Sequence, residues 1–74
     1  MSNEVSKILG EVIKKARIKK SLTQQELSEK VNISRNFISD IERGRYTPST
    51  ENLILLAKTL EIDLNLLKND GNTI

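Results

Sequence analysis

Residues 23 to 43, TQQELSEKVNISRNFISDIER, limit the possible folds of this chain most, because they describe two short helices joined by a tight turn. The aliphatic residues of this segment are Leu27, Val31, Ile33, Ile38 and Ile41. The first two are spaced i, i+4 and the last two i, i+3, so each helix has one apolar face. Between the helices, Asn32 can adopt the left-handed conformation that a sharp turn needs, and Ser34 can cap the second helix. The segment predicts two helices that meet across a turn and share one core.

The second of these helices carries its polar residues away from Ile38 and Ile41. They are Arg35, Asn36, Ser39 and Asp40. A rigid helix that exposes guanidinium, amide, hydroxyl and carboxylate groups suits the edges of base pairs in the major groove of DNA. The alternative for Arg35 is a solvated surface charge. Asp40 has three open roles: reading a cytosine, pairing with a neighbouring arginine, or repelling other sequences.

The charges of the chain are unevenly distributed, although the net charge is only +2. Residues 1–45 hold ten Lys or Arg against six Asp or Glu, which gives +4. Residues 46–74 hold two against four, which gives −2. Basic charge thus accompanies the two-helix segment, as binding to the phosphates of nucleic acid requires.

Composition argues against several classes of site. Cysteine and histidine are both absent, which removes disulfides, thiolate ligands and the commonest metal ligand and general base. No glycine-rich phosphate loop is present, and nothing suggests an apolar pocket around Glu26 and Glu29. The longest apolar run, residues 53–57, is too short to cross a bilayer, and no signal peptide is visible. We expect no enzyme, no metal, no cofactor, no membrane contact and a cytoplasmic location.

Hydrophobic periodicity and capping residues predict one all-α domain over residues 1–74. Five helices are expected, over residues 4–20, 24–31, 35–43, 50–60 and 63–68. Thr23 and Glu26 form a capping box at the start of the second helix. Gly44 ends the third helix, and Ser49 caps the fourth. Residues 69–74 are expected to be a frayed tail.

Several fragments of the chain occur together in a recognisable order. They are L-G-x-x-I at 9–13, Arg17, S-L-T-Q-Q-E-L-S at 21–28, I-S-R-N-F-I-S-D-I-E-R-G at 33–44, and P-S at 48–49 before L-x-x-L-A at 53–57. In this order and spacing, over about residues 9–67, the chain resembles the Xre/Cro-type helix-turn-helix family of phage repressors and bacterial regulators. The resemblance implies a compact five-helix, lambda-repressor-like domain in which helices 2 and 3 form the helix-turn-helix.

The resemblance also implies roles for individual residues. In this family the second helix of the motif lies in the major groove, which makes Arg35 and Asn36 the main readers, with Ser39 and Asp40 one turn further on. The residues implied to contact DNA phosphates are Thr23, Gln24, Gln25, Ser34, Arg43, Arg45 and Tyr46. Thr23 as a cap, Gln25 as plain surface and Tyr46 packed on its loop are the alternative roles.

Two further positions bear on how well the family pattern fits. Arg17 and Glu42 match a partly buried ion pair that ties the first helix to the third, so removal of Glu42 would cost roughly 3–5 kcal/mol. Asn32 stands where the family often has Gly, and Asn tolerates the positive φ of the turn.

One such domain makes too few contacts for tight, specific binding, so we expect a homodimer on a palindromic operator. Leu55, Leu64 and Leu66 are apolar beyond what the inward faces need and are the candidate dimer contacts. The expected function is a bacterial or phage transcription regulator, either a repressor or a controller, which occludes or recruits RNA polymerase. Two alternatives remain open: a protein-interaction or antitoxin-like module with the same fold, and a DNA-binding domain excised from a longer regulator.

Overall fold

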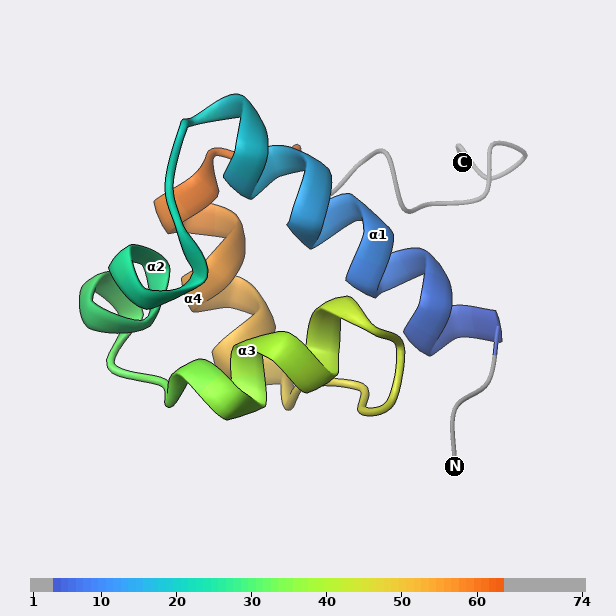
Figure 1. Ribbon diagram of the computed structural model, residues 1–74. Coiled ribbons are helices and arrows are strands. Elements are labelled where there is room, and N and C mark those ends of the chain that lie inside the picture. The colour runs from blue at the N-terminus through green and yellow to red at the C-terminus, as the bar shows by residue number, and fades with distance from the viewer. Residues whose placement is uncertain (1–3, 64–74) are drawn as a thin grey trace.

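The computed structural model describes residues 4–63, which form four helices and no strand (Figure 1). The helices are α1 (Glu4–Lys19), α2 (Gln24–Val31), α3 (Arg35–Glu42) and α4 (Thr50–Leu60). The all-α class and the helix-turn-helix formed by α2 and α3 are as predicted. Within these residues, no helix has the length and apolar character needed to span a membrane.

The prediction of five helices is wrong for the part of the chain that the structure describes. The fifth helix was placed at residues 63–68, but Asp63 is not helical and the rest of that range lies outside the described residues. The physical reason is visible at the end of α4. Glu61 takes a left-handed conformation with φ 57°, and Ile62 donates its N–H to the carbonyl of Ala57, which closes the helix. The expected frayed tail, residues 69–74, also lies outside the described residues.

The starts of three helices are fixed by side chains that the sequence analysis identified. Thr23 Oγ1 accepts the N–H of Glu26 at 3.0 Å, and Glu26 Oε1 accepts the N–H of Thr23 at 2.8 Å, which is a complete capping box. Ser34 and Ser49 each accept the N–H of the residue three positions later, at 3.1 Å. Polar side chains thus satisfy backbone donors at the start of α2, α3 and α4.

The ends of the four helices share one backbone motif. The residue that stops each helix has a positive φ: Ser21 (58°), Asn32 (56°), Gly44 (78°) and Glu61 (57°). In each case the next residue donates its N–H to the carbonyl five positions back, as in the Schellman motif. The turn at Asn32 and the end at Gly44 were predicted, whereas nothing in the sequence marked Ser21 or Glu61 for this conformation.

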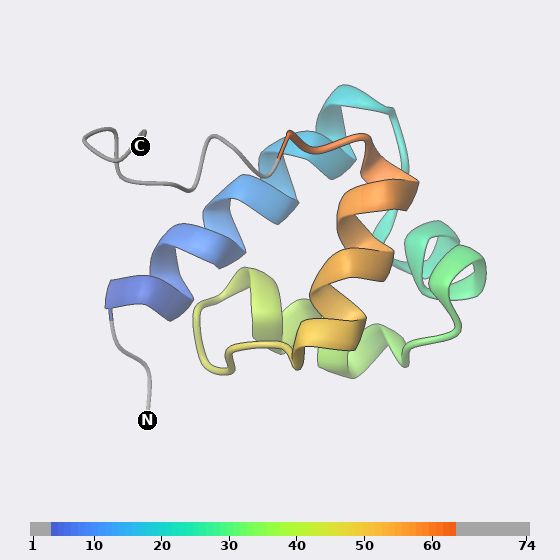
Figure 2. The ribbon, with the colours of Figure 1, turned by 180° about the vertical axis from the view of Figure 1, so that it is seen from behind.

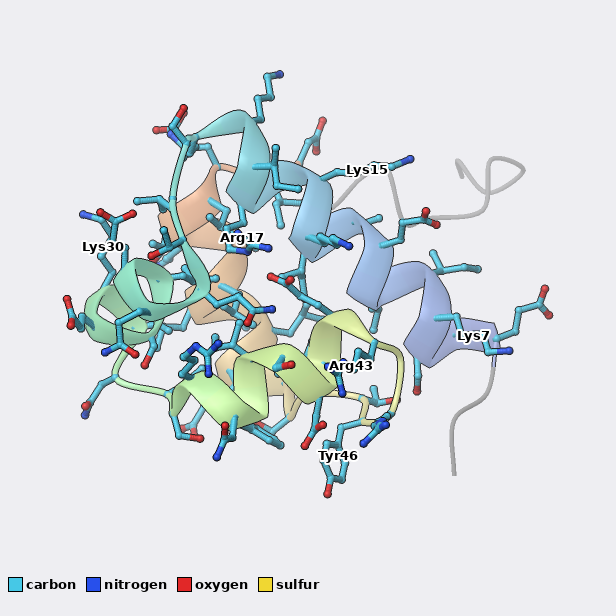
Figure 3. All side chains as sticks on the ribbon, viewed as in Figure 1. Lys7, Lys15, Arg17, Lys30, Arg43 and Tyr46 are labelled. Carbon is cyan, nitrogen blue, oxygen red and sulfur yellow. The ribbon has the colours of Figure 1, made fainter. Side chains whose placement is uncertain are left out.

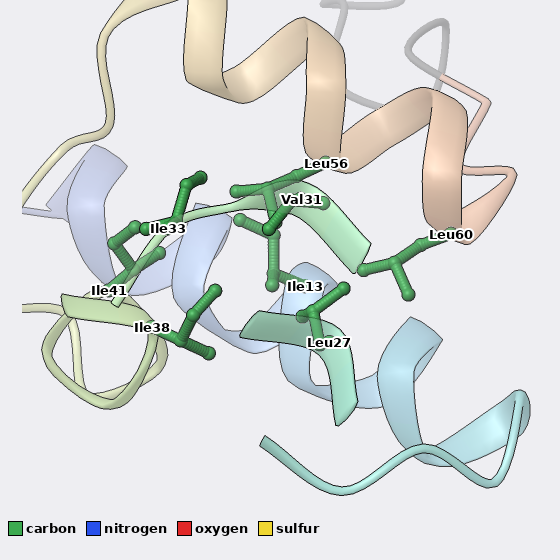
Figure 4. Packing of buried hydrophobic residues seen from close by; sticks show 8 residues of the cluster. All are labelled: Ile13, Leu27, Val31, Ile33, Ile38, Ile41, Leu56 and Leu60. Atoms are coloured by element: carbon green, nitrogen blue, oxygen red, sulfur yellow. The ribbon is translucent and has the colours of Figure 1, made fainter. Parts of the chain in front are cut away.

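The core lies where the four helices meet, because α3 and α4 each pack against both α1 and α2. Figure 2 shows the arrangement from behind, with α4 nearest the viewer. The main cluster of buried side chains is Ile13, Leu27, Val31, Ile33, Ile38, Ile41, Leu56 and Leu60 (Figure 4). All five aliphatic residues of the helix-turn-helix segment belong to this cluster, as predicted.

Helix α1 crosses α3 at Gly10, which is buried. A Cβ atom at this position would lie only 2.3 Å from the carbonyl oxygen of Ile41 and 2.9 Å from that of Glu42. Only glycine lets the two backbones approach this closely. The crossing sets how α1 sits over the C-terminal end of α3, and therefore which part of α3 stays exposed.

Candidate nucleic-acid interface

The outward face of α3 collects the four residues that the sequence analysis proposed as readers of bases. Arg35 and Asn36 are exposed at the start of the helix, and Ser39 and Asp40 are half-buried one turn later. On the opposite face Ile38 and Ile41 are fully buried, with no exposed surface. These two anchors fix the rotation of α3, so the polar residues face solvent from a rigid support.

Asp40 forms an ion pair with Arg45, which lies in the loop between α3 and α4. The distance from Asp40 Oδ1 to Arg45 Nη1 is 3.6 Å. Among the three roles left open for Asp40, the structure contains the pairing with a neighbouring arginine. The arginine offsets part of the repulsion that the carboxylate would otherwise exert on phosphates nearby. Because both side chains reach solvent, the pair itself contributes only about 0–1 kcal/mol to stability.

Tyr46, in the same loop, packs against α3 through an aromatic contact. Its ring centroid lies 5.3 Å from that of Phe37, with the rings tilted by 50°. This geometry is favourable for two aromatic rings. Since about half of Tyr46 remains exposed, the contact holds the loop to α3 while leaving part of the side chain at the surface.

The side chains proposed for phosphate contact at the start of α2 have partners within the protein. Thr23 caps the helix, and the amide nitrogen of Gln25 donates to Glu29 Oε2 at 3.0 Å on the exposed surface. The amide nitrogen of Gln24 donates to Glu42 Oε1 at 3.1 Å. Each amide NH2 has two hydrogens, so Gln24 can keep this bond and still offer one donor to a ligand.

The ion pair expected between Arg17 and Glu42 is present and joins α1 to α3. Arg17 Nε donates to Glu42 Oε2 at 2.7 Å, and Arg17 Nη2 donates to Glu42 Oε1 at 2.9 Å. Arg17 Nη1 donates to the carbonyl of Leu22 at 2.8 Å. The side chains are only 12% and 3% exposed. Figure 3 shows Arg17 reaching from α1 into the space beside α2 and α3.

The electrostatics of this pair favour the charged state of the arginine. The hydrogen bonds to Glu42 raise the pKa of Arg17, with a smaller contribution from the charge of Glu42, while burial acts in the opposite direction. An arginine guanidinium is protonated in proteins in any case, so Arg17 and Glu42 form a full ion pair. Because Glu42 also holds Gln24, a single carboxylate links α1, the start of α2 and the end of α3.

The sequence of residues 13–67 matches the helix-turn-helix family model, and this range covers most of the chain. The chain belongs to the helix-turn-helix family. The assignment identifies it as a DNA-binding transcription regulator and not as an enzyme.

Two relatives of this helix-turn-helix protein come from Bacillus phage phi105. It is 47% identical over 62 residues to the ImmF control region 10 kDa protein, covering 84% of this chain and 69% of that protein. It is 39% identical over 66 residues to the immunity repressor protein, covering 89% of this chain but only 46% of the repressor.

A solved structure has the same arrangement of helices. It is the restriction-modification controller protein C.Esp1396I, crystallised as a tetramer in complex with its natural 35 base-pair operator. The two proteins superpose with a TM-score of 0.76 at 34% sequence identity, over 86% of this chain and 84% of the controller.

Away from the outward face of α3, the structure contains contacts that sequence reasoning missed in this helix-turn-helix protein. The buried hydroxyl of Ser6 hydrogen-bonds the hydroxyl of Thr47, which ties the start of α1 to the loop between α3 and α4. No pattern in the sequence signals a pair of hydroxyl groups so far apart in the chain. The bond between Gln24 and Glu42 was also missed, because the resemblance gave each residue a separate role.

The candidate dimer contacts fall only partly within the described residues. Leu55 lies on α4 and is 39% exposed, and the adjacent Ile54 is 44% exposed. Leu64 and Leu66 lie outside the described residues.

Proposed function

We propose that this helix-turn-helix protein binds a specific two-fold symmetric operator as a homodimer, with α3 in the major groove, and regulates transcription from that site. The observation that carries the proposal is the outward face of α3. Exposed Arg35 and Asn36 stand on a helix whose other face is anchored by the fully buried Ile38 and Ile41. A helix presented in this way fits the width of the major groove and holds its reading groups in fixed positions.

The chemistry of each residue on this face suggests what it reads. Arg35 matches the O6 and N7 acceptors of guanine, and Asn36 matches the N6 donor and N7 acceptor of adenine. Ser39 lies one turn further along and can donate to or accept from either purine or pyrimidine edges. Asp40 can accept from cytosine N4 through Oδ2 while Oδ1 keeps its ion pair with Arg45.

Residues at the ends of α2 and α3 are proposed to contact the phosphates on the two sides of the groove. Partly unpaired N–H groups at a helix start attract anions, which makes the first turn of α2 a suitable contact for one strand. The residues that we propose to contact phosphates are Thr23, Gln24, Gln25, Ser34, Arg43, Arg45 and Tyr46. Arg43 is exposed at the end of α3 and carries the clearest electrostatic role among them.

A homodimer is proposed because one domain of this size offers few base contacts. Two copies of α3 in successive major grooves would lie about 34 Å apart and read a palindromic site. The exposed leucine and isoleucine on α4, Leu55 and Ile54, offer apolar surface for the dimer contact, with Leu64 and Leu66 as further candidates. The similar controller protein, which binds its operator as a tetramer, supports assembly of this kind.

Occupation of the operator would then block or recruit RNA polymerase at a neighbouring promoter, in the cytoplasm of a bacterium or on a phage genome within it. The two phage relatives, an immunity repressor and the ImmF control region 10 kDa protein, favour a role of this class.

The proposal is tested by selecting bound sequences from a pool of random duplexes. We expect recovery of one two-fold symmetric motif, and a dimer bound to it in analytical ultracentrifugation. Arg43→Ala should then weaken binding to the selected duplex and to random DNA alike. Failure to recover any preferred motif, or binding that is unchanged by alterations on the outward face of α3, would exclude sequence-specific recognition by this face.

A further inference from the structure

The start of α1 is packed against the loop that follows α3. Gly44, with φ +78°, is so close to Lys7 that a Cβ atom at Gly44 would lie 3.0 Å from Lys7 Cγ and 3.1 Å from Lys7 Cα. The side-chain stem of Lys7 therefore lies along the backbone of Gly44. One residue earlier in α1, the hydroxyl of Ser6 hydrogen-bonds Thr47 of the same loop. These two contacts fix Lys7 relative to the loop.

Gly44 is flanked by two arginines, so this packing places Lys7 beside a segment that carries two further cations. We call Lys7, Arg43 and Arg45 the α1–loop cationic cluster. All three residues are exposed. Within residues 4–63, the ion pair that neutralises part of this charge is the one between Arg45 and Asp40, and no ion pair involves Lys7 or Arg43. Three cations and one carboxylate give this group of residues a formal net charge of +2.

No acidic residue of α1 forms an ion pair with the cluster within residues 4–63. Glu11 lies one turn after Lys7 on the same face of α1, but its ion pair, at 3.9 Å, is with Lys15. Glu4 lies three residues before Lys7, but no ion pair connects the two. Figure 3 shows Lys7 and Arg43 on either side of the start of the loop, whereas Lys15 lies further along α1. The cluster thus combines cations from α1 and from the segment that follows α3.

We infer that Lys7 contacts the DNA backbone beside Arg43 and Arg45, so that the phosphate contacts of the protein extend from the helix-turn-helix to α1. The inference rests on the proposed function, because it assumes that α3 enters the major groove. With α3 in the groove, its C-terminal end would lie near the phosphates that border the groove. The cluster directly follows that end of the helix. A lysine is a flexible point charge on a long stem, which suits a phosphate contact without base readout.

The test is the salt dependence of binding to a duplex of random sequence and to the selected operator. Each phosphate contact contributes about −0.9 to the slope of log K against log salt. Lys7→Gln keeps the stem over Gly44 and removes only the charge. We expect the loss of affinity between about 50 and 200 mM salt to become roughly 3.5-fold smaller per bound protomer, equally on both duplexes. The thermal midpoint of Lys7→Gln should equal that of the wild type.

Lys15→Gln is the matched control, because it removes the same charge from the same helix outside the cluster. Its salt slope should stay at the wild-type value. An unchanged slope for Lys7→Gln, together with a reduced slope for Arg43→Gln, would overturn the role of Lys7 and leave the proposed function standing. Equal effects of Lys7→Gln and Lys15→Gln would also overturn it, since only overall charge would then matter. Unchanged slopes for both Lys7→Gln and Arg43→Gln would overturn the proposed binding face as well.

Discussion

The substitution Gly10→Ala has two opposing effects on the free energy of unfolding, and the structure indicates which of them is larger. In an isolated helix, replacing an internal glycine with alanine stabilises the helix by about 0.5–1 kcal/mol, because alanine loses less backbone entropy on folding. At this position, however, the added Cβ would lie 2.3 Å from the carbonyl oxygen of Ile41, which is 1.1 Å short of the 3.4 Å at which ordinary contact begins.

The clash is expected to outweigh the gain in helix propensity. The obstructing atoms belong to the backbone of α3 and not to a flexible side chain, so relief requires α1 and α3 to move apart. Separation would loosen the packing of Ile13 against the core and stretch the bonds between Arg17 and Glu42. Overpacking of a tight core typically costs about 1–3 kcal/mol, and a backbone clash lies at or above the upper end of this range. We expect a net loss of roughly 2 kcal/mol, which in a domain of this size lowers Tm by about 8–16 °C.

Urea and thermal unfolding followed by circular dichroism measure this loss. Lys14→Ala serves as the control, because Lys14 is exposed on the same helix and its replacement should change stability by less than about 0.5 kcal/mol. A Gly10→Ala variant as stable as the wild type, or more stable, would refute the argument that glycine is required at the crossing of α1 and α3.

Three further predictions concern recognition, the buried ion pair and acid stability. Arg35→Ala should weaken binding to the selected operator by about 1–3 kcal/mol and relax the preference at one base pair, as measured by repeating the selection; equal losses on operator and random DNA would contradict base reading. Glu42→Ala should lower the free energy of unfolding by roughly 3–5 kcal/mol in urea titrations, because it leaves a buried guanidinium unpaired, and a loss below about 1 kcal/mol would contradict this. The hydrogen bond and charge of Lys20 lower the pKa of Glu61 below its usual value of 4.5, so its contribution to stability is present above that pH and is lost as the pH falls through the lowered pKa. In Glu61→Gln, the decline in stability on acidification should therefore be shallower than in the wild type, and identical pH profiles would exclude the effect.

Sequence reasoning succeeded where a helix boundary is fixed by local chemistry. The bounds of α2 were predicted correctly because Thr23 and Glu26 cap its start and Asn32 accommodates the turn at its end. The rotation of α3 followed from Ile38 and Ile41, whose spacing alone identifies the buried face. The same reasoning placed Arg35 and Asn36 on the outside.

Sequence reasoning failed at one local backbone feature and at contacts between elements that are distant in the chain. The apolar pattern at the C-terminal end predicted a helix from residue 63, but the left-handed Glu61 ends α4 and Asp63 remains non-helical. Gly10 was noticed only as part of a motif, because the need for glycine arises from the carbonyl of Ile41 on another helix. The contact of Lys7 with Gly44 likewise depends on the α1–α3 crossing, which periodicity alone does not specify.

The outward face of α3 makes almost no contribution to the core, and this separation has a consequence for how operator preference can change. Substitutions at Arg35 or Asn36 leave Ile38 and Ile41 untouched, so they should redirect the protein to new sequences at little thermodynamic cost. The scaffold, held by Gly10 and the Arg17–Glu42 pair, tolerates far less variation. A lineage of such regulators can therefore diverge in target while keeping one architecture, and grafting a relative's outer α3 residues onto this chain should transfer that relative's operator choice.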